Sequence, residues 1–296
     1  MNTEESFPQP PLIPAEELEQ CRATGDFCPV LFEWYKYTGL VANFLARIAL
    51  ESPAVRRRKA AHYASLIGLL NRCCRLMLAN VALSHEGLYG ETTAIVDRCI
   101  FESAVKIVWL CQHASDEAFD RYIADGLKTE LALKSQIEQK IAARDGRTLK
   151  IEERMLASIA RYIAASEMTE TQISGSKKLP DLASMIDALG SERLTYVVGQ
   201  QIGSHHVHGT WPSLLTHYLE WEDGSFQPRD HDAETHVNQY VFVPMMVLAA
   251  GDAYCDWLME AEDAGVFKSV IQSVRDEILA INKEVVGGDF TSDQDA

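Results

Sequence analysis

Apolar side chains recur at three- and four-residue spacing through nearly the whole chain, while strand-like alternation of apolar and polar residues is scarce. This period is typical of amphipathic helices, so the fold class we expect is all-α, a multi-helix bundle. Prolines at expected helix starts and a Gly-Ser pair between two helices agree with these boundaries. The predicted helices cover residues 29–51, 53–84, 90–113, 115–145, 148–166, 180–189, 191–208, 231–262 and 265–284.

One short segment departs from the helical pattern. From Tyr218 to Phe226, apolar and polar residues alternate up to the pair Asp223-Gly224, which favours a tight turn. We therefore expect one short β-hairpin near 218–228. Farther along, Pro244 lies inside an apolar run and predicts a kinked helix.

No Gly/Ser-rich linker and no repeat of solenoid length divides the chain. We therefore expect a single helical domain over 15–286, with 115–166 as a candidate helical appendage. The proline-rich residues 1–14 predict a flexible arm, and the acidic residues 287–296 predict a disordered tail.

Composition places the chain among soluble globular proteins, because 47% of its 296 residues are hydrophobic and 24% are charged. The longest apolar run, 237–251, is shorter than the roughly 20 residues that span a bilayer, and residues 1–14 lack the features of a secretory signal. None of the seven cysteines forms a CxxC pair, so we expect reduced thiols rather than disulfides or a zinc ribbon. Together these features predict a cytoplasmic protein without a membrane-spanning helix.

The formal net charge of −16 is concentrated in the last third of the chain, where about 17 acidic side chains accompany about 4 basic ones. Such a surface repels anionic lipid and nucleic-acid phosphates, so we expect neither a membrane nor DNA as a partner. One local basic patch is a candidate RNA contact or else an ordinary solvated helix end. It consists of Arg56, Arg57, Arg58 and Lys59, followed by Arg72 and Arg75.

The predicted helix 90–113 carries apolar side chains on every face, which indicates a buried central helix. Near its middle stand Arg98 and Glu102, four residues apart and therefore on one face. Buried charges require partners. Either the two form a structural ion pair, or Glu102 turns to Lys106 and leaves a polar site open within the bundle.

A second polar segment closes the predicted helix 191–208 and contains three histidines. His205 and His208 share a helix face, whereas His206 points away from it. Because Gly209 would end the helix, its dipole favours protonated imidazoles, which suits a general acid, an anion-binding cation or a simple cap.

A metal site would need further ligands. The chain contains neither HExxH nor the Glu-x-x-His pairs of di-iron bundles, and it also lacks GxGxxG, Walker and GxSxG motifs. These absences disfavour nucleotide-dependent and serine-hydrolase chemistry. We expect no metal or other cofactor, and the weakest alternative is a metal enzyme built on Glu102, His205 and His208.

The two polar segments together resemble a family of bacterial helical proteins known only as a domain of unknown function, DUF5677. Its pattern has an Arg, three residues and a Glu on a buried helix, followed later by Ser, two residues, an apolar residue, His and Gly. The resemblance covers about residues 30 to 260 and implies an all-α bundle in which the two segments face each other. The matching residues are Arg98, Glu102, Tyr196, Ser204, Val207, His208 and Gly209.

More loosely, the chain is similar to HEPN helical bundles, many of which are metal-independent ribonucleases of toxin and antiviral systems that act as dimers. These proteins carry an Arg and a His with four to six residues between them. Arg229 with His236 has this spacing, as do Arg56 and Arg57 with His62. Five residues before His208, where the motif would place its Arg, the chain instead has Gly203.

Two functions follow as hypotheses. The first is a binding or accessory protein of a stress or defence system, in which Arg98, Glu102, Ser204 and His208 form a site that is structural or binds a small anionic ligand. The second is a ribonuclease, with His208 or His236 as general acid or base and Arg98 or Arg229 stabilising the transition state. Exposed apolar candidates such as Trp211 and Trp221 also predict a homo-oligomer.

Overall fold

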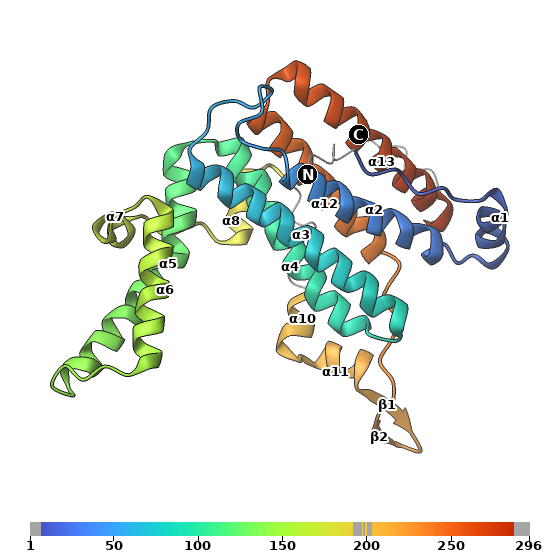
Figure 1. Cartoon of the computed structure of the whole chain (residues 1–296). Helices are drawn as coiled ribbons and strands as arrows, with labels where there is room; N and C mark the ends of the chain where they lie inside the picture. Colours follow the sequence, from blue (N-terminus) through green and yellow to red (C-terminus); the bar gives the residue numbers. More distant parts are fainter. Residues whose placement is uncertain (1–6, 192–196, 198, 200–202, 287–296) are drawn as a thin grey trace.

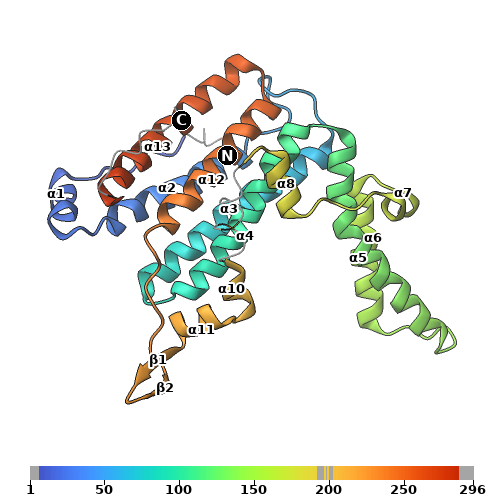
Figure 2. The same cartoon turned by 180° about the vertical axis from the view of Figure 1, so that it is seen from behind.

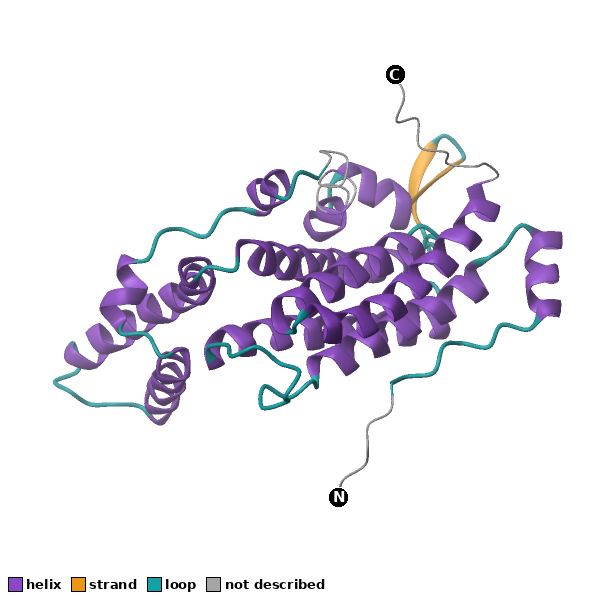
Figure 3. Ribbon diagram, turned by 90° about the horizontal axis from the view of Figure 1, so that it is seen from above, coloured by secondary structure: helices purple, strands orange, loops and turns teal. Residues whose placement is uncertain are grey.

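The computed structural model of the chain describes residues 7–191, 197, 199 and 203–286. In this part the regular secondary structure is helical apart from one hairpin and one isolated bridge. Four long helices form a closed ring in which each packs against two neighbours (Figures 1 and 3). The all-α multi-helix prediction is therefore confirmed. The four helices, in the order in which they pack, are α2 (Cys28–Ala46), α3 (Ala60–Glu86), α4 (Gly90–His113) and α12 (Gln239–Leu258).

Helix α4 is the buried central helix expected from its apolar pattern. Its Ile100, Phe101, Ile107 and Leu110 are almost completely buried between α3 and α12. Helix α13 (Ala261–Val286) covers α2 and α12 on the outside of the ring. This packing removes the apolar stripes of all five helices from water and supplies the main stabilisation of the fold.

Two helices project from the bundle, α5 (Asp116–Ala142) and α6 (Lys150–Ser166), with α7 (Glu170–Gly175) against α5 (Figures 1 and 2). They share a small apolar cluster that is separate from the main core. Helix α8 (Leu182–Ala188) then returns the chain to α4. The division into an arm, one domain and a tail stays a prediction, and residues 287–296 lie outside the described residues.

A compact helix–helix–hairpin unit covers one end of α4. Helix α10 (Gly203–His208) stops at Gly209, whose φ of 55° reverses the chain into α11 (Trp211–His217). Strands β1 (Leu219–Glu222) and β2 (Ser225–Pro228) follow. Their turn has positive φ at both Asp223 and Gly224, as a two-residue hairpin turn requires. The predicted hairpin is confirmed.

Several helix boundaries differ from the predicted ones. Residues 231–238 are not helical, because they run past the start of α4, where the backbone N–H of Gly90 donates to the carbonyl of Ala233 at 2.8 Å. A Cβ at Gly90 would lie 2.7 Å from two backbone carbonyl oxygens, so only glycine permits this approach. The sequence prediction also missed α1 (Ala15–Thr24), α7 and α11. Of the helix expected over 191–208, residues 192–196, 198 and 200–202 lie outside the description, Tyr196 among them.

Residues 53–59 were expected to begin α3, but they cap another helix. The backbone N–H of Arg56 donates to the carbonyl of Leu258 at 2.8 Å, at the C-terminus of α12. Arg58 donates to the Trp257 carbonyl and places its guanidinium 4.4 Å from the centre of the Trp257 ring. Most of the predicted basic patch is thus engaged within the chain, since Arg56 also pairs with Glu260, Lys59 with Asp116, and Arg72 with Ser103.

Two described helices, Ala60–His85 and Gln239–Leu258, are long and apolar enough to cross a membrane by length and composition alone. In the bundle, 39% and 56% of their most apolar windows are buried. Core helices of soluble proteins meet the same criterion, so the predicted localisation stays a prediction.

Candidate functional site

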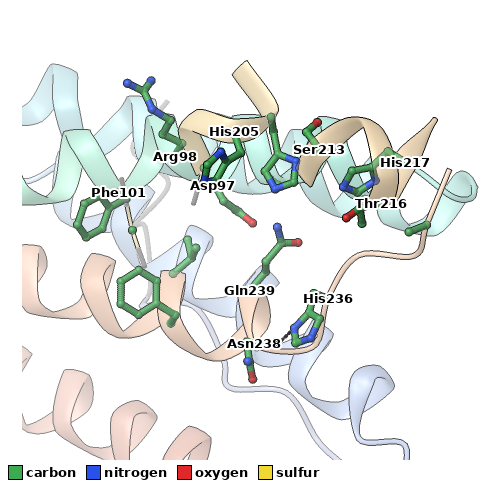
Figure 4. A pocket seen from close by; sticks show the side chains of 18 of the residues that line it. Asp97, Arg98, Phe101, His205, Ser213, Thr216, His217, His236, Asn238 and Gln239 are labelled. Atoms are coloured by element: carbon green, nitrogen blue, oxygen red, sulfur yellow. Dashed lines mark hydrogen bonds between the residues drawn. The ribbon is translucent and has the colours of Figure 1, made fainter. Parts of the chain in front are cut away.

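A cavity of about 500 Å³ lies between α4 on one side, α10 and α11 on a second, and α12 with the preceding loop on a third (Figure 4). Its size is that of a pocket for a small organic molecule. One end is apolar, because Phe101 of α4 and Phe242 of α12 stack with ring centres 5.6 Å apart. Gly199 lies directly against Phe101, and a Cβ there would come within 2.5 Å of the ring.

Asp97 is the most unusual polar residue of the pocket. Tyr35 Oη and Asn80 Nδ2 donate to its Oδ1 at 2.8 and 2.7 Å, whereas its Oδ2 is buried without a partner among the described residues. Burial raises the pKa of this carboxyl to about 7, although both hydrogen bonds act to lower it. In Figure 4 the carboxyl points into the pocket towards Gln239.

Two histidines from consecutive short helices meet on the wall that α10 and α11 form. The rings of His206 and His217 are edge to face, with centres 5.0 Å apart, and both line the cavity. Asp232 holds Nδ1 of the buried His217 by a short hydrogen bond, which fixes the orientation of that ring. Nδ1 of His206 is buried without a partner in the described part of the chain, and burial, followed by His217, lowers its pKa.

Behind this wall, the buried carboxylate of Glu91 is fully engaged. Ser213 Oγ and Tyr218 Oη each donate a short hydrogen bond to it, and the Glu91 backbone N–H donates to Asp232 at 3.1 Å. The bond to Glu91 raises the pKa of Tyr218. Glu91 thereby ties the start of α4 to α11 and positions the histidine wall.

Of the residues predicted for the site, Arg98 and Ser204 do come together. Nε of Arg98 donates to Oγ of Ser204 at 3.3 Å, and a Cβ at Gly203 would lie 3.0 Å from that of Arg98, so glycine allows α10 to approach α4 closely. Arg98 lines the cavity, but its guanidinium points away from the centre (Figure 4). Glu102 does not line the pocket; instead, it accepts from Lys106 Nζ at 2.6 Å.

The predicted histidines divide between the pocket and solvent. His205 lines the cavity, and its Nδ1 lies 2.7 Å from Thr210 Oγ1. His236 is exposed but lines the cavity, whereas His208 is exposed and does not line it. Arg229 is exposed and donates to the carbonyl of Thr216 at 2.7 Å. His62, which has the HEPN-type spacing from Arg56 and Arg57, is buried against Phe119 and does not line this pocket.

Sequence reasoning missed three residues of the pocket: Asp97, His206 and His217. Asp97 shares the core-facing side of α4 with Ala94 and Phe101, and this spacing was a readable signal for a buried acid. His206 was placed on the wrong side, because α10 has only six residues and the reversal at Gly209 brings α11 next to it. No sequence signal marked His217, since α11 itself was not predicted.

Within the described ranges, no group of three or more His, Cys, Asp or Glu side chains is close enough to hold a metal ion. The trio Glu102, His205 and His208 is not such a group, because Glu102 faces Lys106 and His208 faces solvent.

The fold and the cavity define an all-α bundle protein with a ligand-sized, histidine-walled pocket. Comparison with known families matches residues 63–226 to a family of unknown function, DUF5677, and the chain belongs to this family. The match includes α4, α10, α11 and most of the hairpin. Neither a curated protein nor a solved structure matches the chain.

Proposed function

We propose that this protein binds a small organic molecule in the pocket between α4, α10, α11 and α12. The ligand is neutral or cationic, with an apolar ring or chain and a polar head that donates hydrogen bonds. One observation carries the proposal. The cavity is lined by two residues, Asp97 and His206, each with a buried polar atom that has no partner among the described residues. Such atoms cost free energy unless something bonds to them. Both are covered in the free protein, so a ligand head group would bond to them after a small rotation of the two side chains.

The charge around the pocket favours this ligand class over an anion. Asp97 and Glu234 line the cavity, and Asp232 and Glu91 stand directly behind it. The cation of the lining, Arg98, directs its guanidinium outward (Figure 4). The sequence had suggested an anionic ligand or RNA; the carboxylates that surround the pocket repel both.

Shape also fits a ligand with two parts. Asp97 and Phe101 are four residues apart on α4, so their side chains are neighbours on one face. A ring packed on Phe101 and Phe242 would therefore carry its head group to the Asp97 carboxyl. A cavity of about 500 Å³ leaves room for a ligand larger than one ring.

Three probes of one shape test the proposal: benzamidine, benzamide and benzoate. Saturation-transfer NMR and calorimetric titration at pH 7.5 should detect binding of the cation and the amide, with benzoate at least roughly 10-fold weaker. Asp97→Asn should weaken benzamidine roughly 10-fold, whereas Asp187→Asn, an exposed control on α8, should not. Preferential binding of benzoate, or equal binding by both variants, would contradict the proposal.

A metal-independent ribonuclease is a second candidate, and the pair His206–His217 is the observation that favours it. Two neighbouring imidazoles, one oriented by Asp232, are suited to act as a general acid and a general base. Cleavage of total and transfer RNA in EDTA tests this function, with His206→Ala, His217→Ala and His208→Ala purified identically. Loss of cleavage in the first two variants alone would establish the nuclease, and intact RNA with every protein would exclude it.

The accessory role in a stress or defence system stays a prediction from resemblance.

A further inference from the structure

The β1–β2 hairpin projects from the bundle beyond α11 (Figure 1). One of its faces carries exposed aromatic side chains. Trp221 pairs directly with Phe226 across the strands, with ring centres 4.6 Å apart, and Trp211 meets Phe226 at 5.6 Å. These side chains remain strongly exposed, Trp221 at 62% and Trp211 at 56%. Contiguous exposed aromatic side chains typically mark an interaction surface.

The opposite face of the same hairpin is acidic. Because successive side chains of a strand alternate between faces, Glu220 and Glu222 project away from Trp221. Together with Asp223 and Asp230 they line a groove that contains no Lys or Arg among its described residues. The adjacent Arg229 donates to the Thr216 carbonyl.

The backbone of the hairpin is also available. A two-stranded sheet has an unpaired outer edge on each strand. In a hairpin with a two-residue turn, the residues that close the turn, Glu222 and Ser225, hydrogen-bond to each other across the two strands. The next pair, Trp221 and Phe226, therefore directs its backbone N–H and C=O groups away from the partner strand, to the outer edges of the sheet. Extended peptides bind to such edges by adding a strand.

We propose that this hairpin binds an extended basic segment of a partner protein, which adds to the sheet as a third strand. Side chains of the added strand would alternate between the two faces of the sheet. Those on the aromatic face would be apolar, or an arginine stacked on Trp221, and those on the acidic face would be lysines or arginines. The partner motif is therefore one in which apolar and basic residues alternate.

Charge complementarity selects this occupant over two others. Anionic lipid surfaces and nucleic acids can both use exposed tryptophans, but four carboxylates around the same strands repel phosphate groups. A basic peptide instead gains from those carboxylates, and its association should weaken as salt rises.

Fluorescence anisotropy on the full chain tests the inference with a labelled eight-residue peptide of alternating Arg and Val. The same peptide with Glu in place of Arg, an RNA oligonucleotide, and vesicles of neutral or anionic lipid are the comparison probes. Glu220→Lys/Glu222→Lys is matched by Glu16→Lys/Glu19→Lys, which makes the same charge change on exposed positions of α1. Trp221→Ser is matched by Val266→Ser, which removes another exposed apolar side chain.

The Arg/Val peptide should bind, and each hairpin variant should weaken it roughly 10-fold or more, while the matched controls stay within about 2-fold. A salt titration should show weaker binding at higher ionic strength. Equal effects of hairpin variants and controls would overturn the inference, as would preferred binding of the acidic peptide, RNA or vesicles. These outcomes are independent of the benzamidine titration, because the hairpin faces do not line the pocket.

Discussion

Asp97 shows how one residue can join the core to the pocket. Its Oδ1 accepts hydrogen bonds from Tyr35 and Asn80 in a buried network, while its Oδ2 is buried without a partner among the described residues. The network holds the carboxyl in place, and burial makes its charged form costly. The ionised carboxylate therefore lowers the stability of the free protein, although in the proposed function it would strengthen ligand binding.

The stability of the protein should depend on the protonation of Asp97. Its folded-state pKa of about 7 lies above the ordinary value of about 3.9. The folded protein then binds the proton more tightly, so stability falls as pH rises through the window between these two values and changes little above it. Asp97→Asn removes this contribution. Its melting temperature relative to wild type should rise between pH 4.5 and 7.5, as measured by differential scanning calorimetry.

Asp187→Asn is the control for that measurement, because Asp187 is exposed. Its melting temperature should follow wild type at every pH. A constant difference between Asp97→Asn and wild type over this range would show that the carboxyl has no raised pKa.

Among the elements, the segment 55–59 has the clearest structural role. It pairs with the C-terminus of α12 through the bridge Val55–Met259 and through Arg58, whose guanidinium covers Trp257. Cations at a helix C-terminus satisfy its free carbonyls and its dipole. This segment thereby ties the C-terminus of α12 to the start of α3.

Arg58→Ala should destabilise the protein by roughly 1–3 kcal/mol, because it removes a helix cap and a cation–π contact together. The neighbouring Arg57 is exposed, and Arg57→Ala should stay within about 0.5 kcal/mol of wild type. Urea unfolding of both variants gives the comparison. Equal stabilities would mean that the segment is an ordinary surface loop.

The elements that could be predicted from sequence are those defined by local patterns. Helix α4 has apolar residues on every face, and the β-hairpin has an alternating pattern and an Asp-Gly turn. Residues 231–238 were wrongly predicted as helix, because tertiary hydrogen bonds from Gly90 and Glu91, which no local pattern shows, fix their conformation. The contact between Arg98 and Ser204 could be predicted, because both residues belong to the family's sequence pattern. The position of His217 could not, because it depends on the chain reversal at Gly209.

At the scale of the whole molecule, the protein has a tightly packed ring and a projecting α5–α6–α7 unit (Figure 2). The unit has its own small cluster of Ala124, Leu127 and Ile173, and few contacts join it to the ring. Regions with little buried apolar surface open at lower free energy than a core.

Self-association, which the sequence predicts, is a separate property that light scattering would measure.

Hydrogen exchange followed by mass spectrometry should reveal two levels of protection. Amides of α4 and α12 should exchange most slowly, near the limit set by global unfolding, and amides of α6 and the distal half of α5 should exchange at least roughly 10-fold faster. Uniform protection across the ring and the projecting unit would contradict this expectation.

The walls of the pocket come from two parts of the chain. Asp97, Arg98, His206 and His217 lie within the family match at 63–226, whereas Gln239 and Phe242 of α12 lie beyond it. In the proposed ligand site, substitutions at Gln239 or Phe242 would alter which molecule fits the cavity, whereas the wall formed by His206 and His217 would stay unchanged.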